Sequence, residues 1–314
     1  MAFDGEKENP FGDQNVVDCA KEKLRTIGNE NPFFMYVGTL GPHDPYYVPE
    51  KYLQWYPLEE IKLPESYTDD LKDKPHLYLR TQKRFSQLSQ EEQKKSLQHY
   101  LAFCSYEDAL FGELLDVLEE RKLLENTIVI YVSDHGDYAG AHGLWTKGLP
   151  CFKEAYHICS VIGFGNIREK GRVVEEMISL VDYAPTFLDI AGVSPERIFA
   201  GKSLMPFLEG EIIKNWRSEL YTQSNGNELY GIQRGVFDQK FKFVYNGFDF
   251  DELYDLTTDP LEMHNVANDE AYTDIKKEYY RKMWRFAYEN QDMLGDAYIT
   301  TALCDYGPGI IEEI

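Results

Sequence analysis

One short apolar run, residues 128–132 (Ile-Val-Ile-Tyr-Val), narrows the choice of fold class sharply. It follows directly on residues 91–122, where apolar side chains recur at helical spacing and predict one long helix with a single buried stripe. A β-branched run that comes straight after a helix is typical of a parallel strand inside an α/β sheet. The pattern therefore predicts an α/β core.

Further elements extend this pattern toward both ends of the chain. Residues 32–37 and 158–164 are short apolar runs and are expected to be buried strands. Residues 15–27 and 184–191 are expected to be helices, the second with Pro185 at its start and a glycine after its end. For residues 1–214 we therefore expect a mixed, largely parallel sheet flanked by helices.

After about residue 216 the pattern changes to short, alternating, aromatic segments. Residues 219–223, 231–237, 240–245 and 252–256 are candidate strands, and residues 269–289 carry apolar side chains at helical spacing. We expect residues 215–314 to form a C-terminal subdomain, in which a helix covers a small antiparallel sheet.

Composition excludes several classes of partner. The 54 acidic residues outnumber the 32 basic ones, and the formal charge of −22 would repel the phosphate backbone of nucleic acids. No apolar run approaches the ~18 residues of a membrane span, and the first 15 residues do not resemble a signal peptide. The five cysteines lack C-x-x-C spacing, which is compatible with a reducing, cytoplasmic compartment, although the localisation stays open.

Asp134 and His135 follow the apolar run 128–132 at once. The carboxyl ends of strands in an α/β sheet form the ligand crevice, so these side chains are expected to face a site. A carboxylate beside an imidazole is a candidate pair of metal ligands. The alternative is that Asp134 and His135 cap the next turn.

Two more residues could act on an anion at the same place. Lys147 lies in a glycine-bounded loop, where its ammonium group could meet a sulfate or phosphate oxygen, unless it is simply solvated. His43 lies between Pro42 and Pro45 on a stiff loop, and it suits general acid work on a leaving oxygen. The alternative for His43 is an ordinary hydrogen-bonded loop residue.

Six ordered motifs resemble the second half of the sulfatases of the alkaline-phosphatase superfamily. They comprise residues 31–45, 133–137, 143–148, 182–192, 201–208 and 252–262. The resemblance implies a sulfate-ester hydrolase in which Asp134 and His135 are two ligands of a divalent cation, usually Ca²⁺. It implies that Lys147 binds the sulfate and the bridging oxygen, and that His43 helps to protonate the departing alcohol. The substrate would be a small-molecule or sugar sulfate ester.

The chain also departs from the sulfatase pattern. Sulfatases carry an N-terminal strand with paired Asp ligands and a C-x-P-x-R or C-x-A-x-R element, whose Cys is oxidised to the formylglycine nucleophile. None of the cysteines here fits: Cys19, Cys104, Cys151, Cys159 and Cys304. We therefore expect an incomplete cation site and an inactive isolated chain, with formylglycine expected only in the missing segment.

Three readings stay open from the sequence. The first is a sulfatase portion whose N-terminal half is supplied elsewhere. The second is a phosphonate monoester or phosphodiester hydrolase of the same superfamily, and the third is a noncatalytic binding remnant. Strand edges and apolar faces that the other half would cover also predict self-association.

Overall fold

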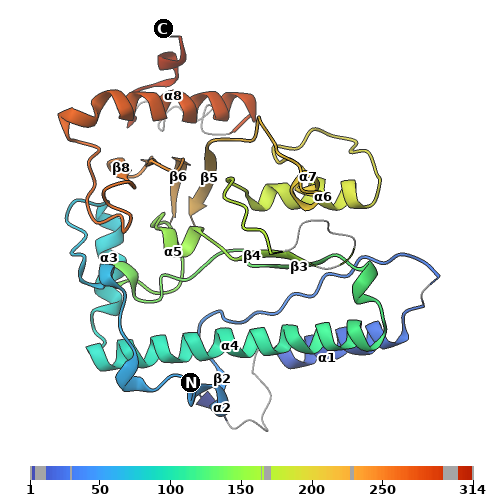
Figure 1. The fold of residues 1–314 in the computed structure, drawn as a ribbon. Coiled ribbons are helices and arrows are strands. Elements are labelled where there is room, and N and C mark those ends of the chain that lie inside the picture. The colour runs from blue at the N-terminus through green and yellow to red at the C-terminus, as the bar shows by residue number, and fades with distance from the viewer. Residues whose placement is uncertain are drawn as a thin grey trace. The chain divides into compact units, whose positions relative to one another are not determined.

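The chain packs as two compact units in the computed structural model, which describes residues 2–3, 12–28, 30–163, 165, 171–226, 230–292 and 303–312 (Figure 1). The first unit comprises Met1–Thr68, Lys83–Thr146 and His157–Asn166. The second comprises Asp69–Gln82, Lys147–Tyr156 and Ile167–Ile314. The helix α3 (His76–Phe85) contributes to both.

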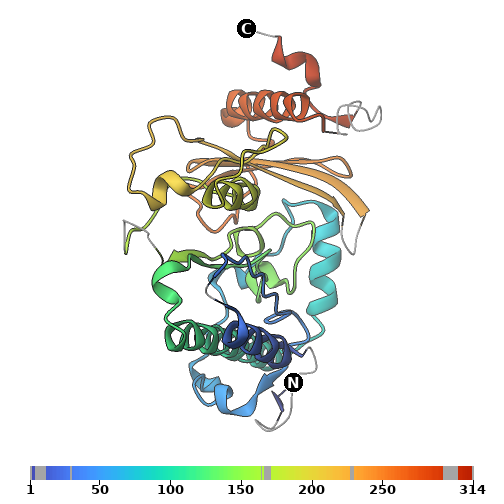
Figure 2. The same ribbon diagram turned by 90° about the vertical axis from the view of Figure 1, so that its right-hand side faces the viewer.

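The long helix α4 (Gln90–Glu120) is the spine of the first unit. It begins with a capping box, in which Ser89 Oγ accepts a hydrogen bond from the Glu92 amide and Glu92 Oε2 accepts one from the Ser89 amide. The helix α1 (Asp13–Thr26) lies alongside α4 in both views (Figures 1 and 2). Both helices confirm the sequence prediction.

Smaller elements complete the first unit. They are α2 (Glu50–Leu53), η1 (Leu58–Glu60), η2 (Glu65–Thr68), η3 (Leu124–Asn126) and η4 (Ala141–Gly143), with the parallel pair β1 (Ala2–Phe3) and β2 (Val48–Pro49). The core of the unit is aromatic: Phe103, Tyr106 and Leu110 of α4 pack with Tyr52 and Trp145.

Strands β3 (Val129–Val132) and β4 (Ser160–Gly163) pair with each other, with Val129 opposite Gly163. The α/β class is confirmed, but this pair is antiparallel, whereas the sequence predicted parallel strands. The reason lies in residues 133–159, which turn the chain back through the short helices η4 and α5 (Lys153–Tyr156) and not through a long crossover helix.

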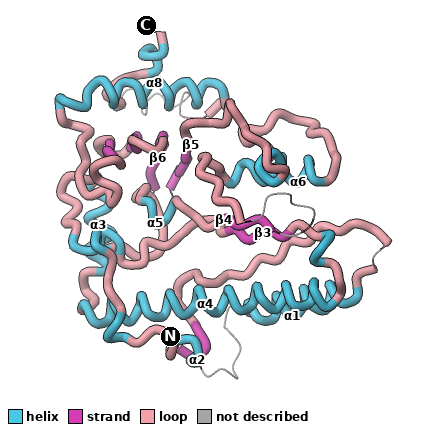
Figure 3. The backbone as a smooth tube through the Cα atoms, viewed as in Figure 1, coloured by secondary structure: helices cyan, strands magenta, loops and turns pink. Residues whose placement is uncertain are grey.

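The prediction of a strand near residues 33–40 is also wrong. The sequence predicted a buried strand at 32–37, yet this segment belongs to none of the sheets among the described residues, and Figure 3 draws it as loop. Its burial nevertheless alternates as in a strand: Phe33 and Met35 pack on the core below, whereas Phe34, Tyr36 and Leu40 are 70%, 84% and 50% exposed. One face is thus buried and the other open, because no described strand covers it.

The second unit is built on a four-stranded antiparallel sheet. Its strands run in the order β5 (Leu220–Gly226), β6 (Tyr230–Phe237), β7 (Phe241–Asn246) and β8 (Glu252–Asp255). The helix α8 (Thr273–Glu289) packs on the sheet through Tyr280, Met283 and Trp284 (Figure 1). This confirms the predicted C-terminal sheet and helix.

The remaining elements of the second unit are short. They are η5 (Leu180–Asp182), α6 (Tyr183–Ile190), α7 (Met205–Leu208), η6 (Glu270–Tyr272) and η8 (Pro308–Ile311). Within the described ranges, no helix has the length and apolar character needed to cross a bilayer.

Polar contacts explain why the units do not divide at the expected boundary between residues 214 and 215. Tyr78 donates a hydrogen bond to Glu252 Oε1 at 2.7 Å, and the Lys153 amide donates one to Glu262 Oε2 at 2.8 Å. These contacts place two earlier segments, residues 69–82 and 147–156, in the unit that contains the C-terminal sheet.

Candidate functional site

Strand β3 ends at Val132, and Asp134 and His135 follow it after one intervening residue, Ser133. Asp134 Oδ1 accepts a hydrogen bond from the His135 amide at 2.8 Å, and its Oδ2 lies 3.5 Å from His135 Nε2. The Asp134 side chain is 83% exposed, so its carboxylate is open to a ligand. The two residues thus face one another and the solvent.

The ring of His135 is oriented by the backbone. Its Nδ1 lies 2.8 Å from the carbonyl oxygen of Gly136. Because a carbonyl can only accept, Nδ1 is the donor, and in the neutral imidazole Nε2 keeps the lone pair. The nitrogen that could bind a cation is therefore the one beside Asp134, and an oxygen next to an imidazole nitrogen suits a divalent ion.

His43 comes to the same place from a distant part of the sequence. Its ring centroid lies 6.5 Å from that of His135, with the planes at 66°. His43 Nδ1 lies 2.6 Å from the Asp44 carbonyl oxygen and 3.3 Å from Asp44 Oδ1, so this nitrogen also donates. The structure thus brings together three of the four predicted site residues.

Asp137 organises the loop that follows, a role that the sequence motif did not reveal. Its Oδ1 accepts hydrogen bonds from the amides of Ala139 at 2.8 Å and Thr146 at 2.9 Å, and its Oδ2 accepts one from Tyr46 at 2.7 Å. Burial raises the pKa of this carboxyl, and the hydrogen bonds from Tyr46 and the two amides oppose the rise.

The loop 137–146 is closed by these contacts. The Tyr138 amide donates to the Thr146 carbonyl at 2.9 Å, and the buried Trp145 donates from its indole nitrogen to Gln93 of α4. The loop therefore has a fixed end at Thr146, the residue that precedes Lys147.

Lys147 opens the stretch Lys147–Tyr156 of the second unit, so its convergence with His43, Asp134 and His135 stays a prediction. Within the described ranges, no group of three or more His, Cys, Asp or Glu side chains could hold a metal ion. The role of Asp134 and His135 as metal ligands therefore stays a prediction.

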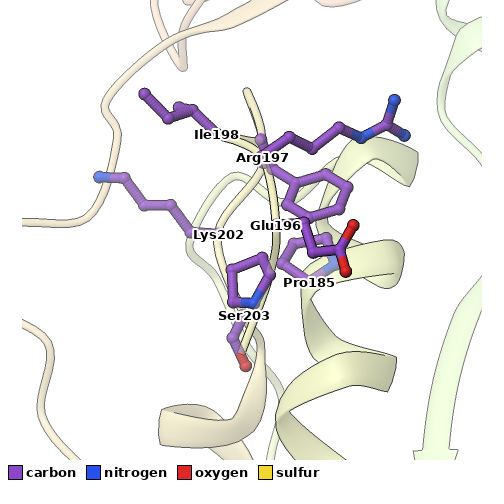
Figure 4. A pocket seen from close by; sticks show the side chains of 9 residues that line it. Pro185, Glu196, Arg197, Ile198, Lys202 and Ser203 are labelled. Atoms are coloured by element: carbon purple, nitrogen blue, oxygen red, sulfur yellow. The ribbon is translucent and has the colours of Figure 1, made fainter. Parts of the chain in front are cut away.

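A surface pocket in the second unit is a different feature, and none of the predicted site residues lines it. Figure 4 shows Arg197 and Lys202 at this pocket, with their cationic ends pointing in opposite directions. Since the two cations diverge, they do not form a cradle for one anion.

Solved structures that are similar to this chain share its fold. Phosphonate monoester hydrolase SpPMH from Silicibacter pomeroyi aligns with a TM-score of 0.79 at 22% identity, over 90% of this chain and 61% of that one. BT4656, solved with its substrate D-glucosamine-2-N,6-O-disulfate, aligns with a TM-score of 0.73 at 22% identity, over 92% and 71%. The fold is that of the sulfatases and their alkaline-phosphatase-like neighbours.

Sequence relatives narrow the class to one family. The sulfatase family model matches residues 6–193, and the model for the C-terminal region of N-sulphoglucosamine sulphohydrolase matches residues 140–289. The choline-sulfatase of Rhizobium meliloti is 31% identical over 81% of this chain and 51% of its own length. The arylsulfatase of Clostridium perfringens is 31% identical over 89% and 58%. The chain belongs to the sulfatase family, and it spans about half the length of the curated relatives it matches.

Proposed function

We propose that this chain carries part of the active site of a sulfate-ester hydrolase, with His43, Asp134, His135 and Lys147 as its functional residues. The supporting observation is that the ring centroids of His43 and His135 lie 6.5 Å apart, beside the exposed Asp134 carboxylate. Two imidazoles and a carboxylate from distant segments, gathered after a strand end, make a site that can bind a cation and an anionic ester.

Each residue has a task in the proposed reaction. Cleavage of a sulfate ester builds negative charge on the leaving oxygen, and a protonated His43 would donate a proton to that oxygen from Nε2. Asp134 and His135 would hold the divalent cation, Ca²⁺ by family resemblance, which when bound stabilises charge on the sulfate oxygens. Lys147 would place a positive charge near the same oxygens.

The proposal includes inactivity of these 314 residues by themselves. No cysteine in the sequence has the context of a formylglycine precursor, and Asp134 and His135 are two ligands where more are needed for a cation. The nucleophile and the paired Asp ligands would come from residues outside these 314. The open face of residues 33–40, with Phe34, Tyr36 and Leu40, is the surface that such a segment would cover, and self-association is the outcome when it is absent.

A second candidate is hydrolysis of phosphonate monoesters. Two phosphonate monoester hydrolases align with TM-scores of 0.79 and 0.76, at least as high as those of the glycan-acting neighbours. Sulfated sugars are the substrate class that other relatives suggest, including an N-acetylglucosamine-6-O-sulfatase from Bacteroides thetaiotaomicron, 34% identical over 58% of this chain. We place sulfate esters first because the family match is to sulfatases.

Reconstitution tests the proposal. The chain alone and the chain joined to an N-terminal sulfatase segment with a C-x-P-x-R element are assayed on p-nitrophenyl sulfate and on p-nitrophenyl phenylphosphonate, with Ca²⁺ or with EDTA. We expect Ca²⁺-dependent sulfate turnover in the joined protein only, lost in His43→Ala and Lys147→Ala and retained in the surface control Lys72→Ala.

Other outcomes have distinct meanings. Turnover of the phosphonate ester in preference to the sulfate would favour the second candidate. Metal-dependent sulfate turnover by the chain alone, abolished by Lys147→Ala, would overturn the proposed inactivity. Full activity of the joined His43→Ala protein would remove His43 from the site.

A further inference from the structure

Two buried carboxyl groups meet where the N-terminal end of α1 lies against the middle of α4. Asp13, the first residue of α1, is 1% exposed, and Glu107 of α4 is 5% exposed. Their side chains are hydrogen-bonded to each other. Two carboxylates in direct contact and away from water repel each other when both are ionised, which favours the protonated form of Glu107.

The pair supports the three residues that precede Pro42. Asp13 Oδ1 accepts a hydrogen bond from the Leu40 amide at 2.8 Å, and Glu107 is hydrogen-bonded to the Thr39 side chain. Gly41 lies so close that an added Cβ would come within 2.2 Å of Glu107 Oε1. Only glycine allows this approach, so the chain from 39 to 41 rests directly on the two acids.

This support extends to His43. The His43 amide donates a hydrogen bond to the Leu40 carbonyl at 3.1 Å. Leu40 therefore connects the acid pair to His43. Its amide donates a hydrogen bond to Asp13, and its carbonyl accepts one from the His43 amide. A displacement of Leu40 would therefore also displace the His43 ring, which lies beside His135.

The surroundings of Glu107 disfavour its charged form. Its Oε1 is buried without a hydrogen-bond partner. The titratable groups that interact with it are Asp13 of α1, Cys104 and Tyr106 of α4, and Tyr131 of β3. No Lys or Arg is among the described groups that shift its pKa. Burial chiefly raises the pKa of Glu107 to about 8; the Thr39 hydrogen bond opposes this, and Asp13 adds to it.

We propose that Asp13 and Glu107 are positioning residues that share one proton, and that this proton keeps residues 39–43 in the arrangement in which His43 faces His135. When the proton leaves, two negative charges are in contact beside Gly41, and the segment moves away from them. The role given to His43 rests on the proposed function, whereas the movement of the segment can be measured without turnover.

The test follows the Leu40 amide by NMR in the ¹⁵N-leucine-labelled chain, with the signal assigned through Leu40→Met. We expect the wild-type signal to move in one step with a midpoint near pH 8. Glu107→Gln, which imitates the protonated acid, should abolish the step and keep the signal at its low-pH position. Asp13→Asn, which removes the neighbouring acid, should shift the midpoint to lower pH, and Glu119→Gln, an exposed change on the same helix, should leave the step in place.

A Leu40 signal that does not move in the wild type across about pH 6 to 9.5, a step that persists in Glu107→Gln, or a midpoint that Asp13→Asn leaves unchanged would overturn the proposal. If the step behaves as expected but His43→Ala leaves the reconstituted enzyme active, the acid pair stands and the catalytic assignment of His43 fails.

Discussion

Tyr46 donates a hydrogen bond of 2.7 Å to Asp137 Oδ2, and this contact joins the loop that carries His43 to the loop that follows His135. Both partners are buried or nearly so, and Asp137 also receives the amides of Ala139 and Thr146. Tyr46 and Asp137 therefore fix the relation between the two loops on which the proposed site depends.

Tyr46→Phe tests that connection. The change removes one hydrogen bond to a buried carboxyl and leaves the ring packing in place, so we expect a loss of about 1.5 to 3 kcal/mol in the free energy of unfolding. Urea denaturation measures the loss. Tyr36→Phe is the matched control, since Tyr36 is 84% exposed, and it should leave stability unchanged. Equal stability of Tyr46→Phe and the wild type would show that Asp137 holds its loop without Tyr46.

The pH dependence of stability tests the Asp13–Glu107 pair independently. The folded-state pKa of Glu107 is raised from 4.5 to about 8, so its contribution to stability is fully present below about pH 4.5 and is lost as the pH rises through about 8. Asp251, whose pKa burial raises to about 6, acts in the same direction at lower pH.

Between about pH 6.5 and 8.5 we therefore expect stability to fall by roughly 2 kcal/mol, and Glu107→Gln to flatten the slope. The measurement is a series of urea denaturation curves. A wild-type stability that rises across this window, or a Glu107→Gln protein with the same slope as the wild type, would contradict the raised pKa.

The ion pair of Lys242 and Glu262 is expected to matter for the second unit. Lys242 Nζ lies 2.6 Å from Glu262 Oε1, with the two side chains 5% and 2% exposed, and Glu262 also accepts the Lys153 amide at 2.8 Å. Lys242→Met leaves the buried carboxylate without its cation and should cost about 3 to 5 kcal/mol of stability.

Lys72→Met is the control for this change, because Lys72 pairs with Asp70 at the surface and should have no measurable effect. Denaturation of both variants, followed by tryptophan fluorescence, compares them. A Lys242→Met protein as stable as Lys72→Met would mean that the buried pair adds nothing.

Periodicity explains what the sequence could predict. Apolar spacing located α4 and α8, because each of these helices buries one regular face, and short apolar or alternating runs located β3 and the C-terminal sheet. The direction in which β4 pairs with β3 was not available from spacing, since it depends on the path of residues 133–159. The open face at Phe34 and Tyr36 was missed for a related reason: an apolar run indicates a strand but not the presence of its neighbours.

The residues of the candidate site also differ in whether the sequence could predict them. Asp134, His135 and His43 could be found from their positions after apolar runs and from motif resemblance. Asp13 and Glu107 could not, because each lies in a polar or amphipathic stretch where an acid normally faces water. Their contact arises only from the packing of α1 on α4.

Paramagnetic broadening by Mn²⁺, a divalent probe, tests most directly whether His43 lies beside a divalent-cation site formed by Asp134 and His135. In the histidine-labelled chain joined to the N-terminal sulfatase segment, we expect Mn²⁺ to broaden the ring signals of His43 and His135 before those of His76 and His264, and Asp134→Asn to remove the effect. Broadening that spares His43, that persists in Asp134→Asn, or that is absent at millimolar Mn²⁺ would contradict a shared site.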